Sequence, residues 1–174
     1  MRIIAGKFAD RSLTPPADPR VRPTAEHVRG ALLDILAPHL PKARVLDLFA
    51  GTGALGLEAI SRGAAFADFV EFRPASLHAL KANVAALRLK ERTRVFKKDA
   101  MLFIAALEPG SYDLAFADPP YESKVLDRLY EIWKARPFSR LLAVEHARAH
   151  KMPAGIERRA FVDTTVTVYE AQTQ

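Results

Sequence analysis

Short apolar runs alternate with amphipathic segments along most of the chain. Five runs, at residues 44–49, 66–72, 94–97, 112–117 and 141–145, have the length and apolar character of buried strands. Helical segments are expected near residues 54–62, 74–87, 101–107 and 124–134. Strands that alternate with helices predict a doubly wound α/β fold around a mostly parallel sheet.

The two ends of the chain depart from this alternation. Residues 156–171 read as two strands with a bend near Asp163, which must pair antiparallel because no helix separates them, as a hairpin that closes the sheet. The first 23 residues read as a basic β arm or hairpin, since four prolines between residues 14 and 23 prohibit a helix interior. Thr24 is a candidate N-cap for a helix whose apolar stripe runs from Val28 to Leu36. We therefore expect an arm over residues 1–23 and a single domain over residues 24–174.

Composition narrows the class of protein. With 174 residues, 49% of them apolar, the chain can bury one sizeable core. The absence of cysteine excludes disulfides and thiolate metal sites, and the five histidines lack close metal-ligand spacing, so no metal is expected. No apolar run approaches the roughly 20 residues that cross a bilayer, so we expect a cytoplasmic protein with no membrane partner.

The distribution of charge indicates a polyanionic partner. The net charge is +6, and residues 1–30 contribute half of it with six cationic and three acidic side chains. The candidate phosphate contacts are Arg2, Lys7, Arg11, Arg20, Arg22 and Arg29. Contacts of this kind give RNA affinity that falls with salt and carries little sequence information.

A glycine-rich turn follows the first predicted strand. Gly51, Gly53 and Gly56 form a G-x-G-x-x-G pattern between a strand and a helix, the context in which a nucleotide-type cofactor approaches the backbone closely. Glu71 ends the next strand, 20 residues after Gly51, where a carboxylate can accept hydrogen bonds from both ribose hydroxyls. Asp99 follows the third strand, where it can meet the exocyclic amine of an adenine.

Asp47, inside the apolar strand before this turn, discriminates between cofactors. A buried carboxylate repels the pyrophosphate of a dinucleotide, whereas it attracts the ammonium and sulfonium groups of S-adenosylmethionine. Its alternative role is to cap the backbone amides of the loop. S-adenosylmethionine is therefore the expected cofactor. The expected cofactor-binding residues are Asp47, Phe49, Ala50, Gly51, Thr52, Gly53, Glu71, Phe72, Asp99 and Ala100.

The fourth strand ends in Asp118-Pro119-Pro120-Tyr121. An exocyclic amine on a nucleobase is a poor nucleophile, because its lone pair is delocalised into the ring. The Asp118 carboxylate and the Pro119 carbonyl can accept its two hydrogens, and the prolines hold these acceptors in place. Tyr121 can stack on a base that has left its helix. The alternative is a strand-terminating turn, in which Asp-Pro and Pro-Pro are common.

These motifs together resemble the RsmD family of 16S ribosomal RNA guanine-N2 methyltransferases. The resemblance runs through "RIIAGKFADRSL", "RPTAEHVRGALLDIL", "DLFAGTGALGLEAISRGA", "YDLAFADPPY" and "DTTVTVYE", essentially the full length. The glycine loop and the DPPY motif are shared with many amino-methyltransferases, while the arm and the first helix are specific to the family. Leu33 stands where we expect Phe, and Val162 where we expect Gly, which bears on local packing.

The resemblance implies a fold and a function. The fold is a Rossmann-like class I S-adenosylmethionine-dependent methyltransferase, with a seven-stranded mostly parallel sheet and helices on both faces. The function is methylation of the exocyclic amine of one guanine in 16S rRNA, on assembled or partly assembled small-subunit particles, by a monomer. The implied catalytic residues are Asp118, Pro119, Pro120 and Tyr121.

Other functions remain open at this point. A DNA adenine amine methyltransferase would use the same DPPY chemistry, although the chain leaves little room for a separate DNA-reading domain. An NAD-dependent oxidoreductase is disfavoured by Asp47, and a non-catalytic RNA-binding assembly factor by the intact Asp118. His146, after the strand-end Glu145, is left out of the predicted site because transfer from a sulfonium needs no strong base.

Overall fold

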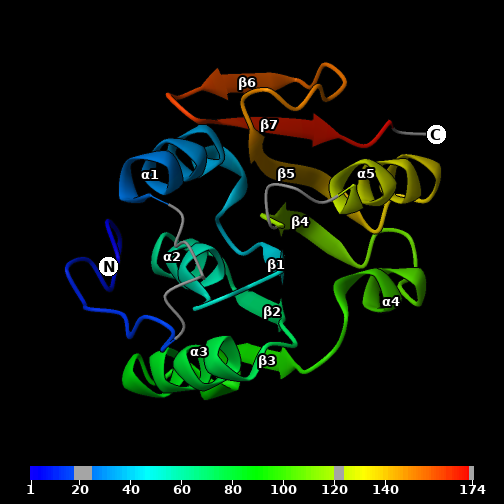
Figure 1. Ribbon diagram of the computed structural model, residues 1–174. Helices are drawn as coiled ribbons and strands as arrows, with labels where there is room; N and C mark the ends of the chain where they lie inside the picture. The colour runs from blue at the N-terminus through cyan, green and yellow to red at the C-terminus, as the bar shows by residue number, and fades with distance from the viewer. Residues whose placement is uncertain (18–24, 120–123, 173–174) are drawn as a thin grey trace.

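A computed structural model describes residues 1–17, 25–119 and 124–172 (Figure 1). Its centre is a seven-stranded sheet with the order β3-β2-β1-β4-β5-β7-β6. The strands are β1 (Arg44–Leu48), β2 (Phe66–Val70), β3 (Thr93–Phe96), β4 (Tyr112–Ala117), β5 (Ser139–Ala147), β6 (Glu157–Ala160) and β7 (Thr164–Glu170). Strands β1 to β5 are parallel, and β7 lies antiparallel between β5 and β6. The predicted α/β sheet and its closing hairpin are confirmed.

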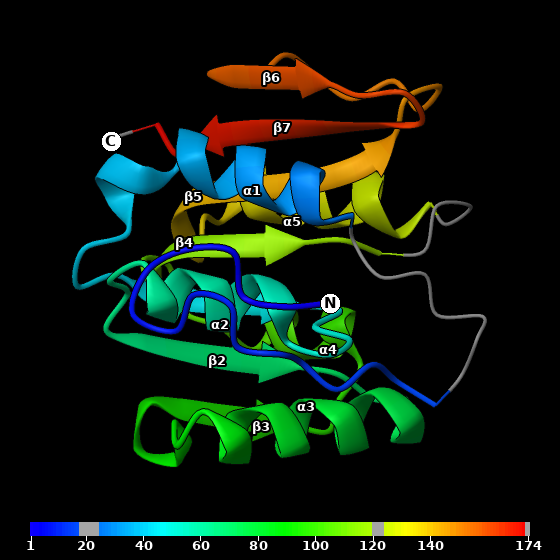
Figure 2. The same ribbon diagram turned by 90° about the vertical axis from the view of Figure 1, so that its left-hand side faces the viewer.

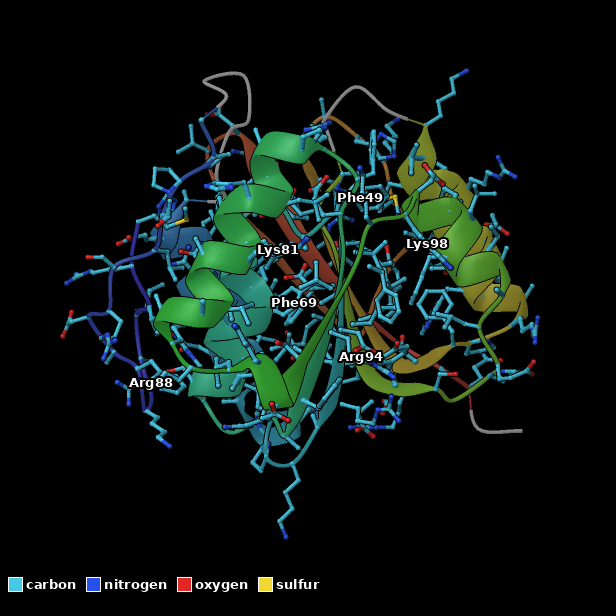
Figure 3. All side chains as sticks on the ribbon, turned by 90° about the horizontal axis from the view of Figure 1, so that it is seen from below. Phe49, Phe69, Lys81, Arg88, Arg94 and Lys98 are labelled. Atoms are coloured by element: carbon cyan, nitrogen blue, oxygen red, sulfur yellow. The ribbon has the colours of Figure 1, made fainter. Side chains whose placement is uncertain are left out.

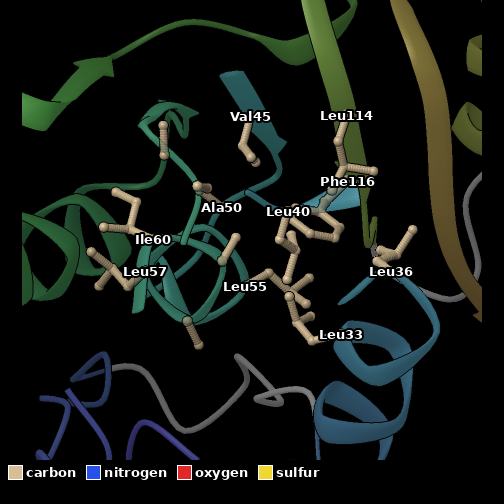
Figure 4. Packing of buried hydrophobic residues seen from close by; sticks show 14 of the residues in the cluster. Leu33, Leu36, Leu40, Val45, Ala50, Leu55, Leu57, Ile60, Leu114 and Phe116 are labelled. Carbon is tan, nitrogen blue, oxygen red and sulfur yellow. The ribbon is translucent and has the colours of Figure 1, made fainter. Parts of the chain in front are cut away.

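Helices cover both faces of the sheet (Figure 1). One face carries α1 (Glu26–Ile35), α2 (Ala54–Ser61) and α3 (Pro74–Ala86), and the other carries α4 (Ala100–Ala105) and α5 (Val125–Ala135). Two short 3-10 turns, Ala37–His39 and Lys90–Arg92, join helices to strands. Each face has its own apolar core, and Figure 4 shows part of the first, in which Leu33 and Leu55 pack near Phe116.

Helix α5 illustrates how the apolar pattern positions an element. Leu126, Leu129 and Trp133 recur with helical spacing and are the buried residues of this helix. The Trp133 indole N–H donates to the Ser139 carbonyl oxygen at 2.9 Å, so the buried ring keeps its hydrogen bond. The element bounds differ from the predicted ones by a few residues. Helix α1 begins at Glu26 with Ala25 at its N-cap, and Thr24 lies outside the described residues.

The N-terminal arm packs against the domain and has little β-structure. One isolated bridge joins Arg2 and Ser12, and Ile3 and Leu13 are buried in the first apolar core. The carboxylate of Glu58 on helix α2, itself fully buried, accepts hydrogen bonds from the backbone amides of Ile4 and of Ala5 at 2.8 and 2.9 Å. The predicted hairpin is therefore present in a short form. Around the bridge, the amides of Ile3 and Leu13 donate to the carbonyl oxygens of Arg11 and Met1 at 2.9 and 3.0 Å.

Within the described part of the chain, no helix is both long and apolar enough to cross a membrane.

Candidate active site

A pocket of about 360 Å³ opens at the carboxyl edge of the sheet, where the strand order reverses between β1 and β4. This reversal is the position at which open α/β sheets bind their ligands. Strand β4 pairs in register with β1 and with β5, which places Phe49, Asp118 and Glu145 at one level of the edge. All three residues line the pocket, as does Glu71 after β2.

The loop after β1 forms the floor of the pocket. Phe49, Gly51 and Gly53 all have positive φ, at 59°, 57° and 79°. A β-carbon on Gly51 would have only the Phe49 carbonyl oxygen within reach, at 4.0 Å, so the missing side chain leaves open space on the pocket side. A β-carbon on Gly53 would lie 2.4 Å from Leu80 Cδ1, so this glycine is required for packing against α3. Positive φ at the non-glycine Phe49 is the kind of local strain that concentrates at functional sites.

Glu71 holds the loops on either side of it. Its Oε2 accepts from the Gly51 amide at 2.9 Å, and its Oε1 accepts from the amides of Phe72 and Arg73 at 2.8 Å each. A carboxylate has about four lone-pair positions, so these bonds leave capacity for a ligand hydroxyl. Phe72 follows it on the rim with 54% of its surface exposed, which makes its ring available to an aromatic ligand.

Asp47 lies below the loop and is 2% exposed. Its Oδ2 accepts from the Gly56 amide at 2.9 Å, so the loop-capping role is present in the structure. Burial raises the pKa of Asp47 well above its usual value, the Gly56 hydrogen bond opposes this rise, and the charges of Asp118 and Glu71 raise the pKa further. Three carboxyl groups therefore share one small volume, and a cation bound among them would favour their ionised forms.

Asp118 and Pro119 follow β4 at the edge of the pocket. Asp118 is half-buried, Pro119 is buried, and both line the cavity. The other two members of the motif, Pro120 and Tyr121, lie outside the described residues. The Asp118 carboxylate is thus placed beside the pocket, while the proposed stacking by Tyr121 stays a prediction.

The residues present fit S-adenosylmethionine. The pocket wall carries the carboxyl groups of Asp47, Glu71, Asp118 and Glu145. Their negative charge favours a bound cation and disfavours a pyrophosphate. The open space at Gly51 and the exposed ring of Phe72 suit the close approach of a nucleoside.

Three predicted cofactor residues, Gly53, Asp99 and Ala100, do not line the pocket. Asp99 is the N-cap of helix α4, where its side chain accepts from the amides of Met101 and Leu102 at 2.9 and 3.0 Å. Ala100 is the buried first residue of that helix. Strand β3 ends at Phe96, so Asp99 serves the next helix and is not a strand-end acid as predicted.

One predicted phosphate contact is wrong. Arg29 is fully buried, donates to the Arg2 carbonyl oxygen, and places its Nε 3.7 Å from the Glu58 carboxylate. A side chain with no exposed surface cannot reach a phosphate. Arg20 and Arg22 lie outside the described residues, and Arg2, Lys7 and Arg11 are exposed.

Several pocket residues were missed by the sequence analysis. Glu145 is 4% exposed, lines the cavity and accepts from the Thr164 hydroxyl at 3.2 Å. Glu145 ends an apolar run in the sequence, as Asp118 does, so the strand-end pattern could have identified it. The β6–β7 turn, with Phe161 and Val162, and His27 on helix α1 also line the pocket, and no local motif marks them. His146, left out of the prediction, does not line it and bonds to Thr167 instead.

Comparison with known proteins places the chain among methyltransferases. The family described as Conserved hypothetical protein 95 matches residues 1–168. "Putative rRNA methyltransferase YlbH" of Bacillus subtilis is 33% identical over 158 residues, which cover 88% of this chain and 86% of that protein. "Ribosomal RNA small subunit methyltransferase D" of Escherichia coli is 41% identical over 128 residues, or 73% of this chain and 63% of that protein. The solved structure "Putative methyltransferase yhhF from Escherichia coli" superposes with a TM-score of 0.85 at 32% identity, covering 100% of this chain and 99% of that one. The Rossmann-like class I methyltransferase fold is thereby confirmed.

Proposed function

The chain belongs to the RsmD-type family, described as Conserved hypothetical protein 95, and from this membership we propose that it methylates ribosomal RNA. The methyl donor is S-adenosylmethionine, and the acceptor is the exocyclic amine of one guanine in the small-subunit RNA. Relatives named as rRNA methyltransferases support the substrate class.

The observation that carries the proposal is the arrangement of carboxyl groups at one edge of the sheet. Asp47 and Glu71 lie at the floor and side of the pocket, and Asp118 lies level with the loop that follows β1. The first two suit the cationic and ribose parts of the donor, while Asp118 faces the same cavity from the neighbouring strand. One pocket therefore serves both the donor and the acceptor.

S-adenosylmethionine supplies an activated methyl group on a sulfonium when it is bound. Asp47, Gly51 and Glu71 would hold it, with Phe72 against its base. The rest of the chemistry belongs to Asp118 and Pro119, whose side-chain and backbone oxygens accept the two hydrogens of the guanine amine. Accepting both hydrogens directs the nitrogen lone pair toward the methyl group, and holding the amine in that geometry lowers the entropic part of the barrier.

Transfer of label from methyl-labelled S-adenosylmethionine tests this function. Small-subunit particles, naked rRNA and duplex DNA are offered to the wild-type protein and to Asp118→Ala, and binding of S-adenosylhomocysteine and of NAD is followed by thermal shift. We expect label in particles or rRNA, its loss in Asp118→Ala, and a thermal shift with S-adenosylhomocysteine alone. Label confined to DNA supports an adenine methyltransferase, and a shift with NAD alone contradicts the proposal.

A further inference from the structure

Six cationic residues lie at the carboxyl edge of the sheet, the edge at which the pocket opens. Each follows a strand or precedes a helix at the carboxyl edge of the sheet, where β2, β3, β4 and β5 end. We call this set the basic rim. Its members are Arg73, Lys97, Lys98, Lys124, Arg148 and Lys151. Arg73 is half-buried and lines the pocket, and the other five are exposed.

Among the described residues, the rim cations make few contacts within the protein. None of the six is within ion-pair distance of a carboxylate among the described residues, and of the six only Arg148 makes a side-chain hydrogen bond there, to the Phe161 carbonyl oxygen at 3.3 Å. The nearby acids have other partners, since Asp99 caps helix α4 and Asp127 pairs with His150 at 2.8 Å.

In the described part of the N-terminal arm, Arg2 and Arg11 are engaged in the protein's own structure. Arg2 pairs with Asp10 at 2.7 Å and lies 3.7 Å from the Glu26 carboxylate. Arg11 donates to the carbonyl oxygen of Ala86, the last residue of helix α3, at 3.2 Å. These contacts stabilise the docked arm and reduce the charge that it offers to an outside anion.

The turn of the arm lies at the amino edge of the sheet, opposite the pocket. In Figure 2 the parallel strands point to the right, and the blue N-terminal segment loops far to the left before it returns. The Lys7 amide bonds to Ser61, the last residue of α2, which confirms this placement. Arg11 lies at the far end of α3, a helix of 13 residues and so of about 20 Å, from the pocket residue Arg73. Figure 3 shows the same separation for labelled residues: Lys98 lies toward the edge of the sheet where Phe49 lies, and Arg88 lies toward the opposite edge.

We propose that the basic rim, and not Lys7 and Arg11 of the N-terminal arm, binds the phosphate backbone of the RNA. The inference rests on the proposed function and adds the surface on which the RNA docks. Five acidic residues line the pocket, so a phosphate is repelled from it, whereas an uncharged base with N–H donors can enter. The rim spans β3 to β5, which is four strand spacings or about 19 Å. It can therefore hold the RNA backbone on both sides of an extruded base.

Two double variants of equal charge test the proposal. Lys97→Ala/Lys98→Ala removes two exposed rim lysines, and Lys7→Ala/Lys90→Ala removes two exposed lysines at the amino edge. Binding of naked small-subunit rRNA is measured over a range of salt, with S-adenosylhomocysteine binding as the control for folding. Because each phosphate contact contributes about 0.7–0.9 to the slope of log affinity against log salt, the rim variant is expected to lose about 1.4–1.8 of slope and about 25- to 60-fold in affinity near 0.1 M salt. The amino-edge variant is expected to keep the wild-type slope.

The methylation assay adds a second readout. The rim lysines do not touch the reacting groups, so the rim variant is expected to raise KM for RNA and leave kcat unchanged. Equal losses of slope in both variants, or a loss only in the amino-edge variant, overturn the inference while methylation by the wild type still supports the proposed function. Failure of the wild type to bind or methylate rRNA would instead overturn the proposed function.

Discussion

Replacing Glu58 by glutamine should strongly destabilise the protein. Glu58 is fully buried, and its two carboxylate oxygens accept from Ile4, Ala5 and Arg62 at 2.8 to 3.0 Å. It is also the carboxylate that faces the buried guanidinium of Arg29, at 3.7 Å. Burial lowers the pKa of Arg29, and the charge of Glu58 opposes that shift, so the two groups depend on each other.

The magnitude follows from what the amide cannot do. Glutamine keeps one acceptor oxygen, but its NH₂ group points a donor at a backbone N–H, which removes a charge-assisted hydrogen bond worth about 1.5–3 kcal/mol. The buried charge of Arg29 also loses its counter-charge, and breaking a buried pair in this way costs about 3–5 kcal/mol in total. For a chain of 174 residues this corresponds to a fall in Tm of about 6–20 °C.

Urea unfolding followed by circular dichroism measures the effect. Asp34→Asn is a matched control, because Asp34 pairs with the same Arg62 but is 71% exposed, and surface pairs of this kind contribute about 1 kcal/mol or less. We expect an unchanged m-value and a large loss of unfolding free energy in Glu58→Gln only. Equal stabilities of the two variants would refute the buried-network argument.

Three further predictions concern the pocket and the titration of buried groups. Burial gives folded Asp47 a pKa well above its unfolded value near 3.8, so the folded chain retains a proton that the unfolded chain has lost, and stability falls as pH rises through this interval. Asp47→Asn should therefore raise the Tm of the ligand-free protein at neutral pH. A lower Tm would argue against this reasoning. Burial lowers the pKa of His146 from its usual 6.5, so stability should fall as the pH drops below 6.5, and urea unfolding of His146→Gln should show a weaker acid dependence. Phe72→Ala removes a stacking surface worth about 1–3 kcal/mol and should weaken S-adenosylhomocysteine binding about 5- to 150-fold in calorimetry, whereas Leu102→Ala, 74% exposed outside the pocket, should not.

The strand-end pattern predicted much of the fold and of the site, because a parallel sheet brings the carboxyl ends of its strands together. Glu71 and Asp118 were found in this way, and they line one pocket together with Asp47, which lies inside β1. The same pattern failed for Asp99, which lies three residues beyond the end of β3 and caps a helix. Local sequence does not distinguish a strand-end acid from an N-cap when the strand boundary is uncertain by a few residues.

The contacts of the arm could not be predicted from its charge. Six cations in the first 30 residues look like a nucleic-acid tail, yet the structure uses Arg2, Arg11 and Arg29 within the protein. A signal was present for Arg29, which lies three and four residues before Leu32 and Leu33 and so on the buried face of its helix. The acid that accepts the arm's amides, Glu58, is about 50 residues away in the sequence, and no local pattern links it to the arm.

The central claim is that Asp118 and Pro119 present a guanine amine to the methyl donor, and nucleoside analysis tests it most directly. Small-subunit rRNA labelled by the wild-type protein is digested to nucleosides, and the labelled species is identified by mass spectrometry against standards. The account predicts guanosine methylated on its exocyclic amine, absent from RNA treated with Asp118→Ala. A label on a ring nitrogen, a ribose or an adenine, or an undiminished label with Asp118→Ala, would contradict it.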